Sequence, residues 1–380
     1  ASDVYKRQVH NGLSKGSKFF GSGYPFLTFS TVFNNYFIPP ELDSFVQSSE
    51  AERQNYSIKR GDVFLTRTSE TSDELGMSCV ALKDYPNATY NGFTKRMRPF
   101  TDRILPEFIG YYMRMPSFRG EFLAFSTMTT RASLKNEDLL GLQIRLPEKE
   151  TQKRIADILS AYDNLIENNQ KQIKLLEEAV QRLYKEWFVN FRFPGYEDTP
   201  IVDGVPEGWE RLPVGELIEK IPRTTQIMAS EYGKEGPIPI IDQSREFIAG
   251  YTDNHASLVN VGKPVIVFGD HTRILKYIQF PFAKGADGTQ LIVSNTDRMP
   301  QSLFYCSLVG VDLSNYHYAR HFKYLKAEEL LVPTQVIAEA FDRFVSPMFS
   351  KIQRLRDINK AATNARDRLL PKLMSGEIEV

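Results

Sequence analysis

The sequence predicts an α+β protein with two similar globular domains, each followed by a long α-helix, and the two helices pairing as an antiparallel coiled coil. Two observations support this prediction. An apolar seam begins at Ile155, and a second seam begins 182 positions later at Ile337. Similar landmarks precede both seams, which indicates a duplicated chain. An isolated amphipathic helix of this length cannot bury its apolar stripe, so the two helices are expected to pair with each other.

Each predicted seam advances in alternating steps of four and three residues over 33 positions, as the a and d positions of a heptad repeat do. The first seam consists of Ile155, Leu159, Tyr162, Ile166, Asn169, Ile173, Leu176, Val180, Leu183 and Trp187. The second consists of Ile337, Phe341, Phe344, Met348, Lys351, Leu355, Ile358, Ala362, Ala365 and Leu369.

Each seam has one polar member, and the two occupy equivalent places: Asn169 and Lys351. A polar residue at such a position costs stability but can fix the register of the pair. In an antiparallel arrangement the midpoints of the helices lie close together, so these two side chains could hydrogen-bond to each other. Alternatively, Lys351 extends into solvent and Asn169 binds water. The sequence leaves both readings open.

The landmarks before the seams divide the chain into five parts. Pro106 and Pro300 each open a helical pattern, and strand-like runs follow glycine at 61–65 and 262–268. The expected parts are a first domain at 10–147, a first spacer helix at 148–190, a linker at 191–205, a second domain at 206–333, and a second spacer helix with tail at 334–376. A short helical pattern at 214–221 opens the second domain. The first domain lacks an equivalent lead-in and is expected to be truncated at its start.

Composition favours a globular protein of the cytoplasm. The chain is 42% hydrophobic and 25% charged, and no apolar run approaches the roughly 18 residues that a membrane span requires. No signal-peptide pattern opens the chain. Its two distant cysteines, Cys79 and Cys306, cannot form a disulfide framework and are expected to be buried in a reducing compartment.

Several short motifs resemble those of the specificity subunit of type I restriction-modification systems. They are Leu146-Pro147 with Gln152, Ile155 and Ala156; Glu177-Glu178 through Trp187-Phe188; Pro206-Glu207-Gly208-Trp209; and 369–378 at the C-terminus. The resemblance covers nearly the whole chain after residue 20. It implies two target-recognition domains, each reading one half of a bipartite DNA site. It also implies adenine methyltransferase and restriction subunits as partners, and these would hold the S-adenosylmethionine, ATP and Mg, so that this chain needs no cofactor.

Charge and geometry agree with a DNA-binding role. The chain has 47 basic and 47 acidic residues, yet residues 58–135 hold twelve Lys and Arg against eight Asp and Glu. Residues 255–326 hold eight against four, so each domain has a locally basic region of the kind that phosphates attract. A 33-residue helix extends roughly 50 Å, enough to space two readers about one turn of duplex DNA apart. The pair of long helices is therefore expected to act as a ruler that sets the distance between the two domains.

The residues expected to touch DNA follow the strand-like runs in both domains. Arg suits guanine and Asn suits adenine, whereas Ser, Thr and Lys suit phosphates. The candidates are Arg67, Thr68, Ser69, Asn91, Lys95, Arg96 and Arg98 in the first domain, and His271, Thr272, Arg273, Lys276 and Lys284 in the second. The alternative is that these residues form ordinary solvated loops.

Catalytic readings find no support in the sequence. The pair Asp270-His271 could suggest a metal site, but no second His or Cys stands at ligand spacing. The chain contains no phosphate-binding loop of the Gly-x-x-x-x-Gly-Lys-Ser/Thr type and no Asn/Asp-Pro-Pro-Tyr/Phe tetrapeptide of the kind that amino-methyltransferases use. A non-catalytic subunit without metal is expected. The competing hypothesis is a coiled-coil scaffold that binds protein and has no DNA specificity.

Overall fold

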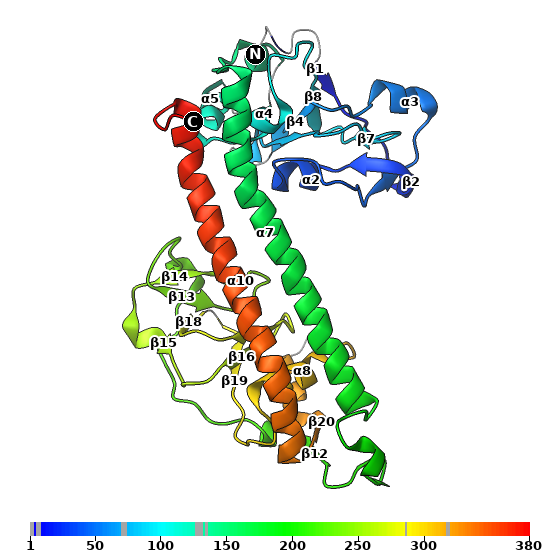
Figure 1. The fold of residues 1–380 in the computed structure, drawn as a ribbon, viewed down its shortest axis with the longest axis vertical. Coiled ribbons are helices and arrows are strands. Elements are labelled where there is room, and N and C mark those ends of the chain that lie inside the picture. The colour runs from blue at the N-terminus through cyan, green and yellow to red at the C-terminus, as the bar shows by residue number, and fades with distance from the viewer. Residues whose placement is uncertain are drawn as a thin grey trace. The chain divides into compact units, whose positions relative to one another are not determined.

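The chain divides into two units, which are described separately here. The computed structural model (Figure 1) describes residues 4, 9–69, 74–125, 132–133, 136–285, 287–316 and 320–380. Unit 1 comprises Ala1–Ile166 with Lys360–Val380, and unit 2 comprises Glu167–Asn359. Each unit contains one globular domain and one stretch of each long helix. Among the described residues, no helix is both long and apolar enough to cross a membrane.

The globular part of unit 1 contains two main sheets. The strand order of the first is β1 (Val9–Asn11), β8 (Thr94–Met97), β4 (Val63–Thr66) and β6 (Ser78–Val80). The second has the order β3 (Phe45–Val46), β2 (Phe20–Leu27) and β7 (Thr89–Tyr90), and a small ladder joins β5 (Thr68–Ser69) to β9 (Ala132–Ser133). Strand β4 is the predicted run after Gly61, and all four of its residues are buried.

Short helices accompany these sheets. They are α2 (Phe29–Asn34), α3 (Glu50–Asn55), α4 (Pro106–Tyr112), α5 (Pro116–Phe125) and α6 (Asn136–Gly141), preceded by a short 3-10 turn, η1 (Ser17–Phe19). Pro106 occupies the first turn of α4, as predicted, where its missing N–H leaves no hydrogen bond unmade. The apolar side chains of β4 and α4 share one core with Ile155 and Leu159.

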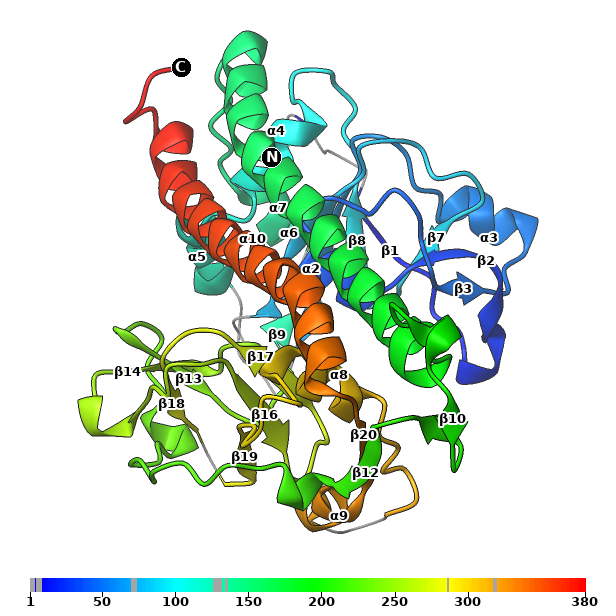
Figure 2. The same ribbon diagram turned by 60° about the horizontal axis from the view of Figure 1, so that its bottom comes forward.

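Unit 2 repeats this plan (Figure 2). One sheet has the order β14 (Gly250–Thr252), β13 (Ile238–Ile241), β18 (Phe282–Lys284) and β15 (Leu258–Val259). Another has the order β17 (Leu275–Ile278), β16 (Val265–Gly269) and β19 (Thr289–Ile292), and β16 is the predicted run after Gly262. In both units one strand has an antiparallel neighbour on one side and a parallel neighbour on the other: β2 lies between β3 and β7, and β13 between β14 and β18.

The remaining elements of unit 2 frame these sheets. They include two helices, α8 (Gln301–Val309) and α9 (His321–Ala327), and four 3-10 turns earlier in the chain, η4 (Tyr196–Asp198), η5 (Val214–Glu216), η6 (Ala229–Glu231) and η7 (His255–Ser257). Two short ladders pair β10 (Ile201–Val202) with β11 (Val205–Pro206) and β12 (Glu210–Pro213) with β20 (Glu329–Val332). The helical pattern predicted at 214–221 is only the turn η5, because Ile218 then pairs with Ser294 in a β-bridge.

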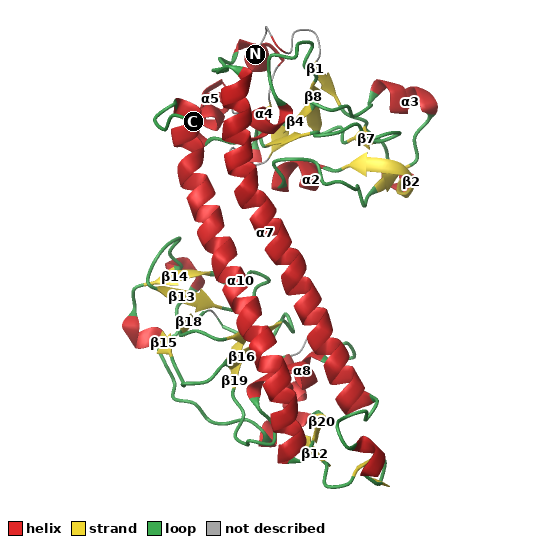
Figure 3. Cartoon of the chain, viewed as in Figure 1, coloured by secondary structure: helices red, strands yellow, loops and turns green. Residues whose placement is uncertain are grey.

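Two long helices, α7 (Lys149–Tyr184) and α10 (Gln335–Ser375), form the predicted antiparallel coiled coil (Figure 3). In unit 1 the start of α7 shares a core with the end of α10, through Ile155 and Leu373. In unit 2 the π-helical turn η3 (Lys185–Val189), which follows α7, packs against the start of α10. The ring centroids of Trp187 and Phe341 lie 5.8 Å apart there.

The seam predicted on α7 agrees with the structure, because its members are all buried or half-buried. The seam predicted on α10 is wrong at three of its ten positions, because Phe344, Lys351 and Ile358 are exposed while the other seven members are buried or half-buried. Phe341, Met348, Leu355, Ala362 and Leu369 lie in it, but the residues that alternate with them in the structure are Ala338, Val345, Ile352, Asn359 and Arg366. The predicted alternates were Ile337, Phe344, Lys351, Ile358 and Ala365, each one position earlier.

The error arose because 337–338 and 344–345 are apolar at both positions, and because the polar residues Asn359 and Arg366 lie in the seam behind the apolar Ile358 and Ala365. Phe344 is 57% exposed and Ile358 is 44% exposed, whereas Val345 and Ile352 are fully buried. Asn169 therefore does not meet Lys351, which is exposed. Its side-chain amide donates instead to Oδ1 of Asn359 at 2.8 Å. The buried polar layer of the coiled coil is thus a pair of asparagines, a type of contact that fixes the register between two helices.

Candidate nucleic-acid interface

In unit 1, three chain segments meet where strands β2, β4 and β7 end. We call residues 27–28, 66–67 and 91–93 the first turn cluster. The backbone N–H of Asn91 donates to the carbonyl of Leu27 at 3.0 Å, and that of Arg67 donates to the carbonyl of Phe93 at 3.0 Å. The Oδ1 atom of Asn91 accepts from the N–H of Phe93 at 2.7 Å, which closes a tight turn. These bonds hold the three segments together.

In unit 2, the ends of the equivalent strands β13, β16 and β18 meet in the same way. We call residues 241–243, 269–274, 285 and 287–288 the second turn cluster. The N–H of Gly285 donates to the carbonyl of Ile241 at 2.9 Å, and that of Asp270 donates to the carbonyl of Gly288 at 2.7 Å. These two bonds connect the same strand ends as the two bonds of the first turn cluster. The duplication therefore preserves this edge of each domain.

The second turn cluster carries three adjacent exposed side chains from the predicted set, those of His271, Thr272 and Arg273. Arg273 has a φ of 60°, a left-handed conformation that is uncommon and costly for a residue with a side chain. One guanidinium nitrogen of Arg273 donates to the carbonyl of Leu313 at 3.1 Å. Lys284 is half-buried at the end of β18, and this burial lowers the pKa of its ammonium group.

The first turn cluster contains two side chains suited to contact a ligand. Arg67 is half-buried, and its Nε atom is buried with no hydrogen-bond partner among the described residues. Phe93 is 56% exposed at the tip of the turn between β7 and β8. Asn91 is half-buried, and its side-chain oxygen Oδ1 accepts the hydrogen bond that closes that turn. Thr68 and Ser69 follow as strand β5, but their side chains lie outside the described part of the structure.

Four other predicted contact residues point inward, which the sequence analysis did not anticipate. Lys95, Arg96 and Lys276 are only 4–6% exposed. The ammonium group of Lys95 donates to Oδ1 of Asn136, and that of Lys276 donates to the carbonyl of Glu246. Arg98 is half-buried and forms an ion pair with Asp62 at 2.6 Å. These cations stabilise the domains from within and cannot meet a base edge in this conformation.

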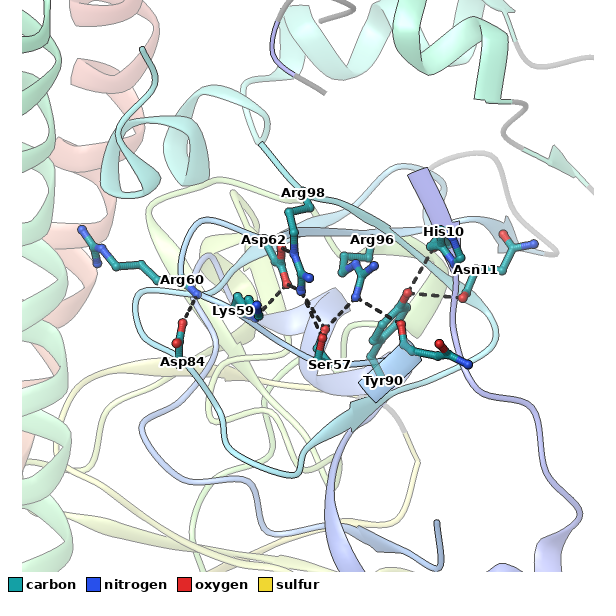
Figure 4. A network of polar contacts seen from close by, with 11 residues as sticks. His10, Asn11, Ser57, Lys59, Arg60, Asp62, Asp84, Tyr90, Arg96 and Arg98 are labelled. Atoms are coloured by element: carbon teal, nitrogen blue, oxygen red, sulfur yellow. Dashed lines mark hydrogen bonds and ion pairs between the residues drawn. The ribbon is translucent and has the colours of Figure 1, made fainter. Parts of the chain in front are cut away.

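Figure 4 shows the network that holds Arg96 and Arg98. Arg98 donates to both carboxylate oxygens of Asp62, at 2.7 and 2.6 Å, and the Asp62 side chain is fully buried. The carbonyl of Ser57 accepts from Arg96 at 2.7 Å and from Arg98 at 3.0 Å. The guanidinium of Arg96 also lies 5.5 Å from the ring centroid of Tyr90. Burial lowers the pKa of Arg96, and the hydrogen bond to Asp62 raises the pKa of Arg98.

Asp270 is also structural. It is 3% exposed, and its carboxylate accepts from the N–H of Phe322 at 2.7 Å. The buried ring of His321 hydrogen-bonds through Nδ1 to the Asp270 carbonyl and through Nε2 to the Tyr316 carbonyl. Both ring nitrogens are therefore occupied. Among the described residues no group of three His, Cys, Asp or Glu side chains could hold a metal ion.

Nucleophilic chemistry has no evident site among the described residues either. Both cysteines are fully buried, and this burial raises the pKa of the Cys79 thiol to about 12 and that of Cys306 further. A buried thiol in apolar surroundings stays protonated and is inert. The turn clusters offer guanidinium, hydroxyl, imidazole and backbone groups at an exposed edge. Such groups can donate hydrogen bonds to phosphates and base edges.

The sequence analysis missed two residues of the turn clusters, Gln243 and Phe93. Gln243 follows β13 and bonds to two other segments of the second turn cluster. A signal existed, because Gly23-Tyr24-Pro25 before the end of β2 and Gly236-Pro237 before β13 mark the same strand in the two copies. Phe93 lies inside the run 90–98 that supplies four of the candidates, but it is not among them.

Comparison with known proteins shows similarity to one family. Residues 8–178 match the family described as type I restriction modification DNA specificity domain. The chain is 24% identical to the type I restriction enzyme MjaIX specificity subunit of Methanocaldococcus jannaschii, over 97% of this chain and 89% of that one. It is 23% identical to the HindI specificity subunit of Haemophilus influenzae, over 94% and 95% of the two chains.

A solved structure shares the fold. It is the S subunit of a type I restriction-modification system from M. genitalium, which matches with a TM-score of 0.58 at 13% identity, over 98% of this chain and 94% of that one. The two-domain layout with paired long helices described above is thus a fold already seen in this class of protein. Taken together, the matching domain, the relatives aligned over nearly their whole length and the shared fold make this chain similar throughout to the specificity (S) subunits of type I restriction-modification systems.

Proposed function

We propose that the chain is the DNA-specificity subunit of a type I restriction-modification complex. Each globular domain reads one half of a bipartite target through its turn cluster. Partner subunits carry out adenine methylation and restriction at the site that this chain selects. The chain itself is non-catalytic and needs no cofactor of its own.

The observation that carries this proposal is the pair of matched backbone hydrogen bonds in the two turn clusters. Loops diverge quickly between duplicated domains unless a shared role maintains their framework. Here the bonds Asn91–Leu27 and Gly285–Ile241 have lengths of 3.0 and 2.9 Å, while the side chains presented at the two edges differ. A constant framework with different side chains is what two readers of different half-sites require.

The chemistry of the exposed groups supports duplex DNA as the ligand. Arg67 and Arg273 each carry a planar guanidinium group that matches the O6 and N7 acceptors of guanine. Phe93 offers an apolar surface that suits a thymine methyl group. The exposed ring of His271 can donate to a phosphate or a base, and the Thr272 hydroxyl, whose proton is bonded to the Gln243 carbonyl, can accept from a base donor.

The direct test is to purify the chain alone and together with its cognate methyltransferase subunit, and to assay methylation of a DNA library with S-adenosylmethionine. We expect methylation at one bipartite adenine-containing motif in the complex and none with the chain alone. Single-molecule sequencing of the modified library would report the motif.

Two outcomes would contradict the proposal. Turnover of S-adenosylmethionine by the isolated chain would show that it is itself an enzyme. A complex that assembles and methylates without sequence preference would favour the scaffold hypothesis, because the chain would then contribute assembly and no recognition.

A further inference from the structure

Gln243 links all three segments of the second turn cluster. Its Oε1 atom accepts from the backbone N–H of His271 at 3.1 Å, and its Nε2 atom donates to the carbonyl of Asp287 at 2.8 Å. Its own carbonyl accepts from the hydroxyl of Thr272 at 2.7 Å. One residue, just after the end of β13, thus holds the 269–274 turn on one side and residues 287–288 on the other.

Two glycines make room for this side chain. A Cβ atom on Gly269 would lie 2.9 Å from Cβ of Gln243 and 2.1 Å from Oγ1 of Thr272. A Cβ atom on Gly288 would lie 2.6 Å from Nε2 of Gln243, and the φ of 84° at Gly288 also favours glycine. The clamp therefore depends on close backbone approach on both sides. Gln243 is built into the cluster and does not lie loosely on its surface.

The groups that Gln243 holds are the ones that face outward. His271 and Thr272 are bonded to Gln243 directly, and Arg273 follows them in a left-handed conformation. Such a conformation persists only where the surrounding structure determines it. The bonds from Gln243 to the two residues before Arg273 supply part of that restraint.

In the first domain, the segment that follows the equivalent strand β2 is held by different bonds. After β2, Thr28 caps helix α2, and its Oγ1 atom accepts from the N–H of Thr31 at 3.1 Å. The segment after β13 contains no helix, and Gln243 bonds there to the neighbouring turns. The two readers therefore share a backbone framework but have different supports for their turns.

We propose that Gln243 is a positioning residue that sets the sequence specificity of the second domain. It keeps the 269–274 turn and residues 287–288 in fixed register, so that the side chains of His271, Thr272 and Arg273 meet base edges as one rigid surface. This inference rests on the proposed DNA-specificity function. It adds that specificity for one half-site depends on a residue that need not touch DNA.

The test uses the full chain with its cognate methyltransferase subunit and compares four proteins. They are the wild type, Gln243→Ala, Gln243→Glu and Gln279→Ala. Gln243→Glu keeps the acceptor for the His271 N–H but loses the donor to Asp287. Gln279→Ala is the matched control, because the Gln279 amide also donates one bond to a backbone carbonyl, that of Phe349 at 2.8 Å, away from the turn cluster.

Two readouts are needed. Sequencing of methylated adenines should show that both Gln243 variants relax the half-sequence read by the second domain, with the other half unchanged. Methylation of the wild-type site should slow by about tenfold, as expected for the loss of one or two hydrogen bonds. Hydrogen–deuterium exchange of the free chain should show the His271 amide exchanging about tenfold faster in Gln243→Ala. Gln279→Ala should retain the wild-type motif.

The outcomes distinguish a failure of the proposed function from a failure of the inference about Gln243. A wild-type complex that methylates no bipartite site would overturn the proposed function and this inference with it. A bipartite wild-type motif that both Gln243 variants retain at the wild-type rate would overturn the inference alone. Equal relaxation of both halves, or the same relaxation in Gln279→Ala, would also overturn it, since a general loss of stability would then be the cause. If Gln243→Ala does not fold, Gln243→Glu and its exchange pattern decide the question.

Discussion

Replacing Arg98 with alanine should destabilise the first domain and should not act as the loss of a DNA contact. Arg98 makes two hydrogen bonds to Asp62, at 2.7 and 2.6 Å, and the Asp62 side chain is fully buried. Without Arg98, that carboxylate keeps the bond from the N–H of Lys59 at 2.8 Å as its remaining described partner. Removing one member of a buried ion pair costs about 3–5 kcal/mol. Because Arg98 is partly exposed and the Lys59 bond survives, we expect about 3 kcal/mol.

Hydrogen–deuterium exchange with peptide resolution measures this effect within a two-domain chain. A loss of about 3 kcal/mol corresponds to exchange roughly a hundred times faster, provided that the amides of β4 and β8 exchange through opening of the domain. The amides of β16 in unit 2 serve as an internal control and should not change. Arg98→Lys should lie between the wild type and Arg98→Ala, because lysine keeps the charge but cannot donate to both carboxylate oxygens in the same planar geometry.

A specific result would refute this reasoning. If Arg98→Ala left the protection of β4 within about 0.5 kcal/mol of the wild type and relaxed one half of the methylated motif, then Arg98 would be a DNA reader. The double variant Asp62→Asn with Arg98→Met offers a further check. It should be less destabilised than Arg98→Ala, because no uncompensated charge remains buried.

Three further predictions follow from the structure. Asn169→Leu should lower stability by about 1–2 kcal/mol in thermal denaturation, and adding Asn359→Leu should restore much of the loss, because the half-buried Asn359 amide then no longer faces an apolar side chain; no coupling between the two sites would contradict the polar layer. Burial raises the pKa of Tyr85 to about 12, so its neutral form favours folding below pH 10 and that contribution disappears as the pH rises from 10 to 12; Tyr85→Phe should make the fall in urea-unfolding free energy over this range shallower, and an unchanged slope would contradict this. Inserting one heptad between Ile173 and Leu176 lengthens α7 by about 10 Å, so the methylated motif should keep both halves and gain one or two base pairs of spacer; an unchanged spacer in an active complex would show that the helices do not set it.

The sequence predicted the architecture well because the signals for it are long and repeated. A seam of ten positions on α7 averages over many residues, and the antiparallel pair with two duplicated α+β domains is the fold observed. The α10 seam was partly misplaced because Phe344 beside Val345 and Lys351 beside Ile352 left two nearly equal stripes. The choice between the two stripes depends on how α10 packs against α7, and the residue pattern of one helix does not reveal that packing.

The candidate interface was harder to predict because charge alone does not indicate direction. Arg96 and Arg67 are both arginines next to predicted strands, yet Arg96 is 4% exposed and bonded to a backbone carbonyl, while Arg67 lies at the edge of its domain. Alternation along β8 does not reveal that Arg96 points inward, because all four residues of that strand are buried. Gln243 escaped notice for a related reason: its role comes from bonds to segments about 28 and 44 residues away.

The central claim is that each domain reads its own half of the target, and a pair of matched substitutions tests it most directly. The measurement is single-molecule sequencing of methylated adenines in DNA treated with the complex that contains Arg67→Ala or Arg273→Ala. Loss of a bidentate base contact should cost about 1–3 kcal/mol in discrimination at that base. We predict that Arg273→Ala relaxes one half-sequence only and Arg67→Ala only the other. If either substitution relaxed both halves equally, or if both relaxed the same half, the assignment of one half-site to each domain would be wrong.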